Sequence, residues 1–220
     1  MKKAILFGAS GFVGSCLLEE LLNNADYSDV TVVVRKDLNI SHPKLRTVIG
    51  DYAALPGLKE RIDADEVFIT LGTTKKKTPD EKVYYQIDHD YPVLAAKIAK
   101  KRGAKAVFVV TAVGANANSG MFYVRTKGET ERDIIALGME HTHIFRPSMI
   151  MGDRKESRPL EKVLIRVFRV INPIFGSSRY RGIEGKDIAR AMNNAAKVQS
   201  EKGQSEKVKV YHWKEMNELL

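Results

Sequence analysis

Apolar runs and amphipathic stretches alternate along the chain through about residue 150. Short apolar runs predict strands at 4–7, 30–34, 46–49, 66–70, 106–110 and 142–146. The run at 30–34 is rich in valine, as is typical of strands buried on both faces of a parallel sheet. Helical spacing of apolar positions predicts a helix that ends at Asn23-Asn24 and further helices at 81–102 and near 122–137. The order predicts an α/β fold with a doubly wound, Rossmann-like parallel sheet.

Two interruptions modify this pattern. Pro92 lies inside the helix expected at 81–102 and predicts a kink or a broken start. From Pro147 onward the pattern is more irregular, with a basic amphipathic helix expected near 160–171, a helix near 186–197 and a strand at 208–210. We therefore expect one domain over 1–220, of which about 147–220 forms a small C-terminal lobe on the substrate side.

Length and cysteine content limit the class of protein. The 220 residues, 44% of them hydrophobic, are enough for one substantial core but not for two full domains. The single cysteine, Cys16, excludes an internal disulfide and is expected to be a small buried residue. No apolar run is long enough to span a bilayer. These features predict a cytoplasmic protein that does not act in a membrane.

The net charge of +9 favours anionic partners, such as a phosphorylated cofactor or an acidic substrate. The basic residues are spread along the chain, and aromatic residues do not interleave with them as a single-strand binding platform requires. Nucleic acid is therefore a disfavoured partner, and most of these cations are expected on solvated surface. A protein partner bound through the basic surface remains an alternative.

A glycine motif, Gly8-Ala-Ser-Gly11-Phe-Val-Gly14, joins the first strand to the first helix. Gly8 permits the tight turn, Gly11 lets the backbone approach a phosphate, and Gly14 lets the helix pack closely on the sheet. The helix N-terminus then offers N–H groups to the anion. The alternative, a merely tight strand–helix turn, is less favoured, and the motif predicts a nicotinamide dinucleotide site.

The end of the second strand bears on which dinucleotide binds. NAD sites usually place an acidic residue there, whereas NADP sites place a cation against the 2′-phosphate. This strand ends in Arg35-Lys36, and Asp37 follows too late. Arg35 therefore favours NADP(H) as the cofactor, and NAD(H) is the alternative. Arg35 and Lys36 could also be surface cations without a role in binding.

Tyr123-Val-Arg-Thr-Lys127 places a phenol and an ammonium four residues apart, on one face if the segment is helical. An adjacent cation favours the phenolate, so the tyrosine can exchange a proton with a carbonyl or alcohol while a nicotinamide exchanges a hydride. Thr111, at the end of the fifth strand, could orient the substrate oxygen or simply bond to the backbone. Tyr123, Lys127 and Thr111 are the predicted catalytic residues.

Together these residues resemble the short-chain dehydrogenase/reductase superfamily in its atypical or extended members. A closer likeness is to the Tat-interacting protein oxidoreductase family. It is carried by segments along nearly the whole chain: Leu71-Gly-Thr-Thr74, Asp88-His-Asp-Tyr91, Phe122-Tyr-Val-Arg-Thr-Lys-Gly-Glu129, Phe145-Arg-Pro147 and Gly152-Asp-Arg-Lys-Glu-Ser-Arg-Pro159.

The resemblance implies a Rossmann-like fold and a set of NADPH-binding residues. These would be Gly8, Ser10, Gly11, Phe12, Val13, Gly14 and Arg35, with Asp51 at the adenine, Leu71, Gly72 and Thr73 along the middle of the cofactor, Tyr123 and Lys127 at the nicotinamide ribose, and the backbone after Arg146-Pro147 near the carboxamide.

The chain departs from the family pattern in two places. Ala112 follows Thr111 where relatives commonly have a pair of serines. The asparagine of the proton relay has no evident counterpart; Asp88 is the nearest candidate and is expected to be a solvated helix residue.

Two further groups of residues could bind a ligand. In the charged loop 152–159, Arg154 and Arg158 could clamp an acidic substrate or pair with nearby glutamates. His141 and His143 lack a third ligand, so no metal site is expected.

The leading hypothesis is an NADP(H)-dependent oxidoreductase that transfers a hydride to or from a small carbonyl or alcohol. Ala112 favours a first alternative, a redox-sensing module that binds NADPH with little turnover. A second alternative is a nucleotide-sugar epimerase or dehydratase, which uses the same tyrosine–lysine pair.

Overall fold

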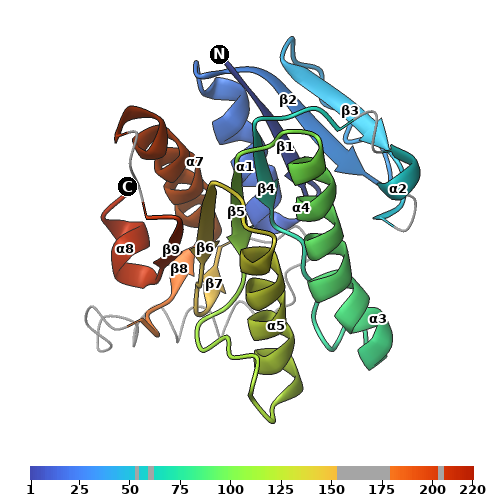
Figure 1. Cartoon of the computed structure of the whole chain (residues 1–220), viewed down its shortest axis with the longest axis vertical. Coiled ribbons are helices and arrows are strands. Elements are labelled where there is room, and N and C mark those ends of the chain that lie inside the picture. Colours follow the sequence, from blue (N-terminus) through green and yellow to red (C-terminus); the bar gives the residue numbers. More distant parts are fainter. Residues whose placement is uncertain (53–54, 59–61, 153–178, 203–205) are drawn as a thin grey trace.

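A parallel sheet forms the centre of the computed structural model, which describes all residues except 53–54, 59–61, 153–178 and 203–205. Seven of the described strands form this sheet, in the order β3-β2-β1-β4-β5-β6-β9 (Figure 1), and every neighbouring pair is parallel. The strands are β1 (Lys2–Phe7), β2 (Tyr27–Val34), β3 (Leu45–Ile49), β4 (Glu66–Ile69), β5 (Ala106–Val110), β6 (His141–Phe145) and β9 (Val208–Tyr211). The predicted Rossmann-like sheet is confirmed.

The strand order reverses between β1 and β4, because the chain runs outward from β1 to β3 and then returns to β4 on the other side. In open α/β sheets, ligands bind beyond the carboxyl ends of the strands at such a switch point. The glycine motif follows β1, so it lies at this point of the sheet.

Helices cover both faces of the sheet. Leu6 of β1 belongs to the core shared with α1 (Phe12–Asn23) and α7 (Gly185–Lys202). Its neighbour Ile5 belongs to the core shared with α4 (Tyr91–Lys101) and α5 (Phe122–Ala136), which lie together on the other face (Figure 1). The side chains of a strand alternate between faces, so both faces of β1 are apolar and buried.

The helix expected at 81–102 consists of three segments. α3 (Glu81–Tyr85) begins at Asp80, whose carboxylate accepts from two backbone N–H groups, and leads into a single π-helical turn, η3 (Gln86–Asp90). α4 then starts with Pro92 in its first turn, where the missing N–H of proline costs no helical hydrogen bond. The broken start predicted from Pro92 is confirmed, whereas the π turn has no signal in the pattern of apolar positions.

The C-terminal third is divided between the main sheet and a smaller unit. β9 extends the main sheet and α7 packs against α1, whereas β7 (Ile150–Met151) and β8 (Ile183–Glu184) pair separately. α8 (Trp213–Asn217) ends the described chain. The helix expected near 160–171 lies outside the described residues, so a distinct C-terminal lobe stays a prediction.

A short helix, α2 (Leu55–Leu58), precedes β4, and residues 35–44 connect β2 to β3 without a helix. Among the described residues, no helix combines the length and apolar character needed to cross a membrane.

Candidate functional site

The turn after β1 needs glycine at two of its three motif positions. Gly8 has a φ of +97°, in the region that favours glycine. A Cβ on Gly14 would lie 2.1 Å from the Gly8 carbonyl oxygen, so only glycine lets α1 approach the turn this closely. The Gly11 N–H donates to the same carbonyl at 2.9 Å and closes the turn.

The start of α1 is suited to an anion. Gly11 is the N-cap and has no side-chain hydrogen bond at that position, and both Ser10 and Gly11 are exposed. An uncapped helix N-terminus carries partial positive charge and offers N–H groups to phosphate. The glycine cradle and this helix start therefore fit a dinucleotide pyrophosphate.

Phe12 and Val13, which follow the turn, direct their side chains into the protein. Val13 is buried in the core between α1 and the sheet. A Cβ added to Gly152 or Gly185 would lie 2.4 Å from the Phe12 ring, so these glycines lie directly against the ring. Any contact of Phe12 and Val13 with the cofactor would therefore be made by their backbone groups and not by their side chains.

Arg35 and Asp51 follow β2 and β3, and both are exposed at the carboxyl edge of the sheet. Tyr52 lies between this edge and the glycine turn, and its ring contacts that of Tyr91 at 5.5 Å between centroids. Burial raises the pKa of Tyr52 to about 12, against the opposing effects of the Arg35 charge and a hydrogen bond with the Gly8 backbone. Tyr52 is not among the site residues predicted from the sequence, although its position directly after Asp51 could have indicated it.

A buried ion pair lies at the centre of the site. Lys127 Nζ is 2.6 Å from Asp88 Oδ1, and the side chains are 8% and 1% exposed. Asp88 Oδ2 accepts the Thr73 N–H at 2.8 Å. A Cβ on Gly72 would be 3.6 Å from both charged atoms, so this glycine lies beside the pair. The expectation that Asp88 is a solvated helix residue is wrong, because the π turn directs its side chain inward.

Tyr123 lies in the first turn of α5, the helix that also carries Lys127, and it is 46% exposed. Leu71, in the loop after β4, is buried. Partial burial raises the pKa of Tyr123, the Lys127 charge lowers it, and the Asp88 charge raises it further. The phenol is therefore protonated at neutral pH. The structure brings Tyr123, Lys127, Gly72 and Thr73 together, as the sequence predicted, and adds Asp88.

Thr111 has a different environment from the one expected. Its hydroxyl is buried and donates to Glu131 Oε1 at 2.5 Å. Arg146 Nε donates to the same carboxylate at 2.9 Å, and the Arg146 Nη2 to its other oxygen. The Thr111 proton is committed to Glu131, so the structure does not support the expected role of Thr111 in polarising a substrate oxygen. Glu131, four residues after Lys127, was missed, although that helical spacing could have indicated it.

Pro147 is buried, and its carbonyl accepts the Val113 N–H at 2.9 Å. This bond fixes the segment after β6 against the segment after β5. The charged loop at 153–159, including Arg154 and Arg158, lies outside the described residues.

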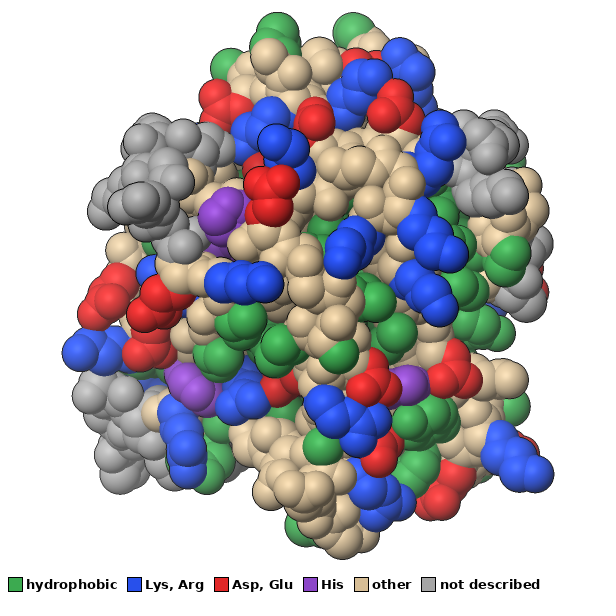
Figure 2. All heavy atoms as spheres, in the orientation of Figure 1, with side chains coloured by type: hydrophobic (Ala, Val, Ile, Leu, Met, Phe, Trp, Pro, Cys, Tyr) green, Lys and Arg blue, Asp and Glu red, His purple; other side chains and the backbone are tan. Residues whose placement is uncertain are grey.

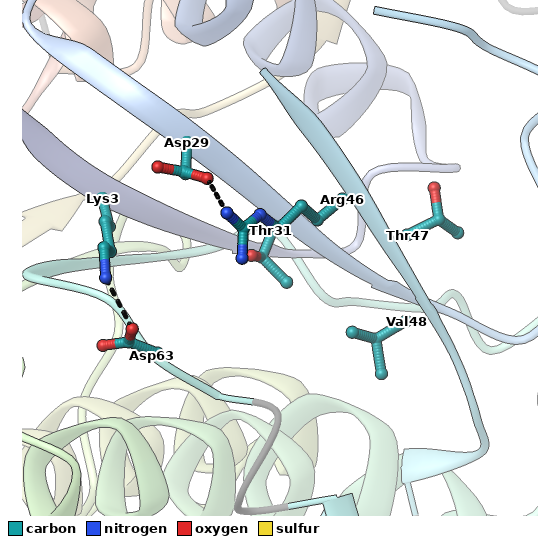
Figure 3. Close-up of a pocket in the computed structure, with 7 residues that line it drawn as sticks. All are labelled: Lys3, Asp29, Thr31, Arg46, Thr47, Val48 and Asp63. Atoms are coloured by element: carbon teal, nitrogen blue, oxygen red, sulfur yellow. Dashed lines mark hydrogen bonds and ion pairs between the residues drawn. The ribbon is translucent and has the colours of Figure 1, made fainter. Parts of the chain in front are cut away.

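Two cavities lined by described residues lie away from this site. One of about 350 Å³ lies beside β1, β2 and β3, next to the ion pairs Lys3–Asp63 and Arg46–Asp29 near the amino ends of these strands (Figure 3). The other, of about 330 Å³, is lined by Pro56 and the outer side of α4. Neither contains the glycine turn or Tyr123, and a strand's amino end is not where such folds bind dinucleotides. We therefore place the candidate site at the carboxyl edge.

The basic residues do not gather in one patch on the face shown in Figure 2. Lys and Arg side chains are scattered over it, with Asp and Glu side chains among them. This distribution is typical of solvated surface, as the sequence predicted for most of these cations.

Comparison with known proteins places the chain among dinucleotide-binding proteins. Residues 8–164 match the model of a family described as NAD(P)H-binding. The chain is 30% identical to Protein FMP52-1, mitochondrial, of Scheffersomyces stipitis, covering 98% of this chain and 97% of that one. It is 31% identical to Protein fmp52, mitochondrial, of Aspergillus niger, with the same two shares. Both relatives are named as mitochondrial proteins, which contradicts the expected cytoplasmic location. That expectation rests on the single cysteine, which indicates only a reducing setting and does not distinguish one compartment from another.

Solved structures share the fold. MoeE5 in complex with UDP-glucose and NAD has a TM-score of 0.68 at 19% identity, over 96% of this chain and 76% of that one. A UDP-glucose 4-epimerase from Thermotoga maritima, solved with UDP-glucose, has a TM-score of 0.70 at 15% identity, with the same two shares. Identities this low show a common fold and carry no information on the substrate of this chain.

Proposed function

Because this chain belongs to a family described as NAD(P)H-binding, we propose that it is an NADP(H)-dependent oxidoreductase of the short-chain dehydrogenase/reductase type, acting on a small carbonyl or alcohol. The observation that carries this proposal is the cluster of Tyr123, Lys127 and Asp88 at the carboxyl edge of the sheet, beside the loop that follows β4. A proton donor and a buried cation next to a dinucleotide cradle are the parts that hydride transfer to a carbonyl requires.

The proposed cofactor site follows the carboxyl edge from β2 to β6. The glycine turn and the start of α1 would bind the pyrophosphate, Arg35 the 2′-phosphate, and Asp51 the adenine. Leu71, Gly72 and Thr73 would line the middle of the cofactor, with Tyr123 and Lys127 at the nicotinamide ribose and the backbone near Pro147 at the carboxamide. The preference for NADP(H) rests on the exposed cation Arg35 at the end of β2.

The proposed chemistry divides between the protein and the nicotinamide. A bound nicotinamide would supply or accept the hydride. Tyr123 would give its phenol proton to the carbonyl oxygen, and Lys127 would stabilise the phenolate that results. The Lys127 ammonium has three donors, so the ion pair with Asp88 leaves it donors for a ribose hydroxyl.

One observation favours a second candidate, a redox-sensing module that binds NADPH with little turnover. Thr111 and Ala112 directly follow β5, and the only hydroxyl of this pair is committed to Glu131. A site without a second polarising hydroxyl would still bind the cofactor, but it would catalyse less well.

NADPH oxidation over a panel of aldehydes, ketones and quinones tests the two candidates, with NADH run in parallel to test the cofactor preference. We expect Tyr123→Phe to reduce turnover by about 100-fold or more, because general acid catalysis typically contributes that much. NADPH affinity, measured by fluorescence titration, should remain. Tyr85→Phe is the matched control, because Tyr85 stacks on His89 and takes no part in the site.

The outcomes separate the candidates. Turnover that is lost in Tyr123→Phe and kept in Tyr85→Phe supports the oxidoreductase. Tight NADPH binding without turnover in any variant would favour the sensing module. Failure to bind either dinucleotide would contradict both.

A further inference from the structure

Asp88 joins η3 to two other segments of the candidate site, α5 and the loop after β4. One carboxylate oxygen lies 2.6 Å from Lys127 Nζ on α5, and the other accepts the Thr73 N–H at 2.8 Å in the loop after β4. Its backbone carbonyl accepts the hydroxyl of Thr130 at 2.8 Å. The residue is therefore held from both sides and in turn fixes the position of the Lys127 ammonium.

The π turn explains how Asp88 reaches this position. A π-helical turn contains one more residue per turn than an α-helix and often occurs at functional sites. Asp88 and His89 are the buried residues of this turn, while Asp90 is exposed. The turn thus directs one carboxylate into the site and leaves the other at the surface.

Burial makes the pair electrostatically important. Asp88 is 1% exposed, so water screens its charge weakly, and a carboxylate this close cancels much of the field of the ammonium. Among the described residues, the titratable groups that face Tyr123 are Lys127 on its own helix, Asp88 on η3 and Tyr84 on α3. Tyr84 is buried and its pKa is raised, so it is neutral. Tyr123 therefore faces a nearly neutral pair instead of a bare cation.

We propose that Asp88 is a positioning residue that holds Lys127 and keeps the Tyr123 phenol protonated, so that the site acts as a general acid for carbonyl reduction at neutral pH and reaches its oxidising form only at alkaline pH. This inference rests on the proposed oxidoreductase function. In reduction, the carbonyl carbon receives the hydride of the reduced nicotinamide and the carbonyl oxygen takes the Tyr123 proton. Solvent then returns a proton to the phenolate, so charge and atoms balance.

The titration of the Tyr123 phenol tests this inference without any substrate. Tyrosine labelled with ¹³C at Cζ is followed by NMR, and the Tyr123 signal is identified by its loss in Tyr123→Phe. We expect the wild-type phenol to titrate above the ordinary value of about 10. Asp88→Asn should lower the midpoint by about one pH unit or more, a tenfold change in the proton equilibrium, because the Lys127 charge is then uncompensated.

Asp90→Asn is the matched control. It removes the same charge two residues away, from a side chain that is exposed and paired with His89. A midpoint unchanged by Asp88→Asn, or lowered as much by Asp90→Asn, would overturn the inference. Should Asp88→Asn fail to fold, the wild-type titration still decides: a midpoint clearly below the ordinary tyrosine value contradicts a neutralised Lys127.

The second arm measures the pH profile of turnover, with the alcohol product of any carbonyl that the enzyme reduces. In the wild type, alcohol oxidation should rise only at alkaline pH, and Asp88→Asn should move that rise toward neutral pH by about one unit. A merely structural role would lower turnover at every pH without moving the profile. If no variant turns over and the NMR titration behaves as expected, the proposed function fails while the effect of Asp88 on Tyr123 stands.

Discussion

At the residue scale, His143 on β6 illustrates how burial sets the charge of a side chain. It is 1% exposed, its ring stacks on Phe108 with centroids 4.5 Å apart, and its Nδ1 is 2.8 Å from the Tyr211 hydroxyl. Burial lowers the pKa of His143 to about 4, because a charged ring is disfavoured in this apolar stack. The residue is therefore neutral in the folded protein.

This shift predicts an acid sensitivity. The unfolded histidine binds a proton near its ordinary pKa of about 6.5, whereas the folded one does not, so stability is complete above that pH and falls as the pH drops toward about 4. The loss should reach about 2–3 kcal/mol in the free energy of unfolding. Urea unfolding at several pH values checks this. In His143→Gln the free energy of unfolding should depend less on pH, whereas His42→Gln, in the loop before β3, should keep the wild-type dependence. Equal slopes in all three proteins would contradict the prediction.

The residue scale also shows what sequence could not supply. The spacing of Tyr123 and Lys127 predicts a shared helical face, and the structure has it. Helical periodicity predicts an exposed side chain for Asp88, because that periodicity does not include a π turn. Such a turn changes the direction of the side chains that follow it along the helix. Thr111 was correctly placed at the end of β5, but its partner Glu131 comes from another element, and only the packing of α5 on the sheet brings the two together.

At the element scale, the contact between β1 and α1 depends on a missing side chain. A Cβ on Gly14 would meet the Gly8 carbonyl oxygen at 2.1 Å and its carbon at 2.7 Å, both of which are backbone atoms that cannot move aside. The helix would have to shift away from the turn that is proposed to hold the pyrophosphate.

Gly14→Ala is therefore expected to destabilise the protein by about 1–3 kcal/mol and to weaken NADPH binding, because overpacking displaces the helix start. Thermal unfolding and fluorescence titration measure the two effects. Gly120→Ala is the control, since no atom lies within 4 Å of a Cβ placed there. A Gly14→Ala protein that melts and binds NADPH as the wild type does would show that the turn tolerates a side chain.

Elements with strong patterns were predictable because the local sequence decides them. The strands of the main sheet and the helices α1 and α5 follow from apolar runs and helical spacing. The two-residue strands β7 and β8 were not predicted, because so short a pairing has no periodicity of its own and depends on segments that meet only in the fold.

At the scale of the whole molecule, the C-terminal third closes the main core. Asn24, after α1, donates to the Oδ1 of Asn193 on α7 at 2.7 Å, and both side chains are buried. Met192 and Ala195 of α7 belong to the same apolar core as Leu6 of β1. The irregular sequence beyond Pro147 predicted an appended lobe, yet the described helix α7 packs against α1 and the edge strand β9 pairs with β6 of the main sheet.

We therefore predict that α7 and β9 unfold together with β1 in one cooperative transition. Asn193→Ala leaves the buried Asn24 amide without its partner and should cost about 1–3 kcal/mol. Native-state hydrogen exchange should show this loss equally in the slowest amides of β1 and of β9, because both exchange by global unfolding. Asn194→Ala, whose side chain bonds the half-buried carbonyl of Leu219, should cost less. Protection lost from β9 alone would instead mark the C-terminal segment as an independently opening unit, and the lobe expected from sequence would be the better description.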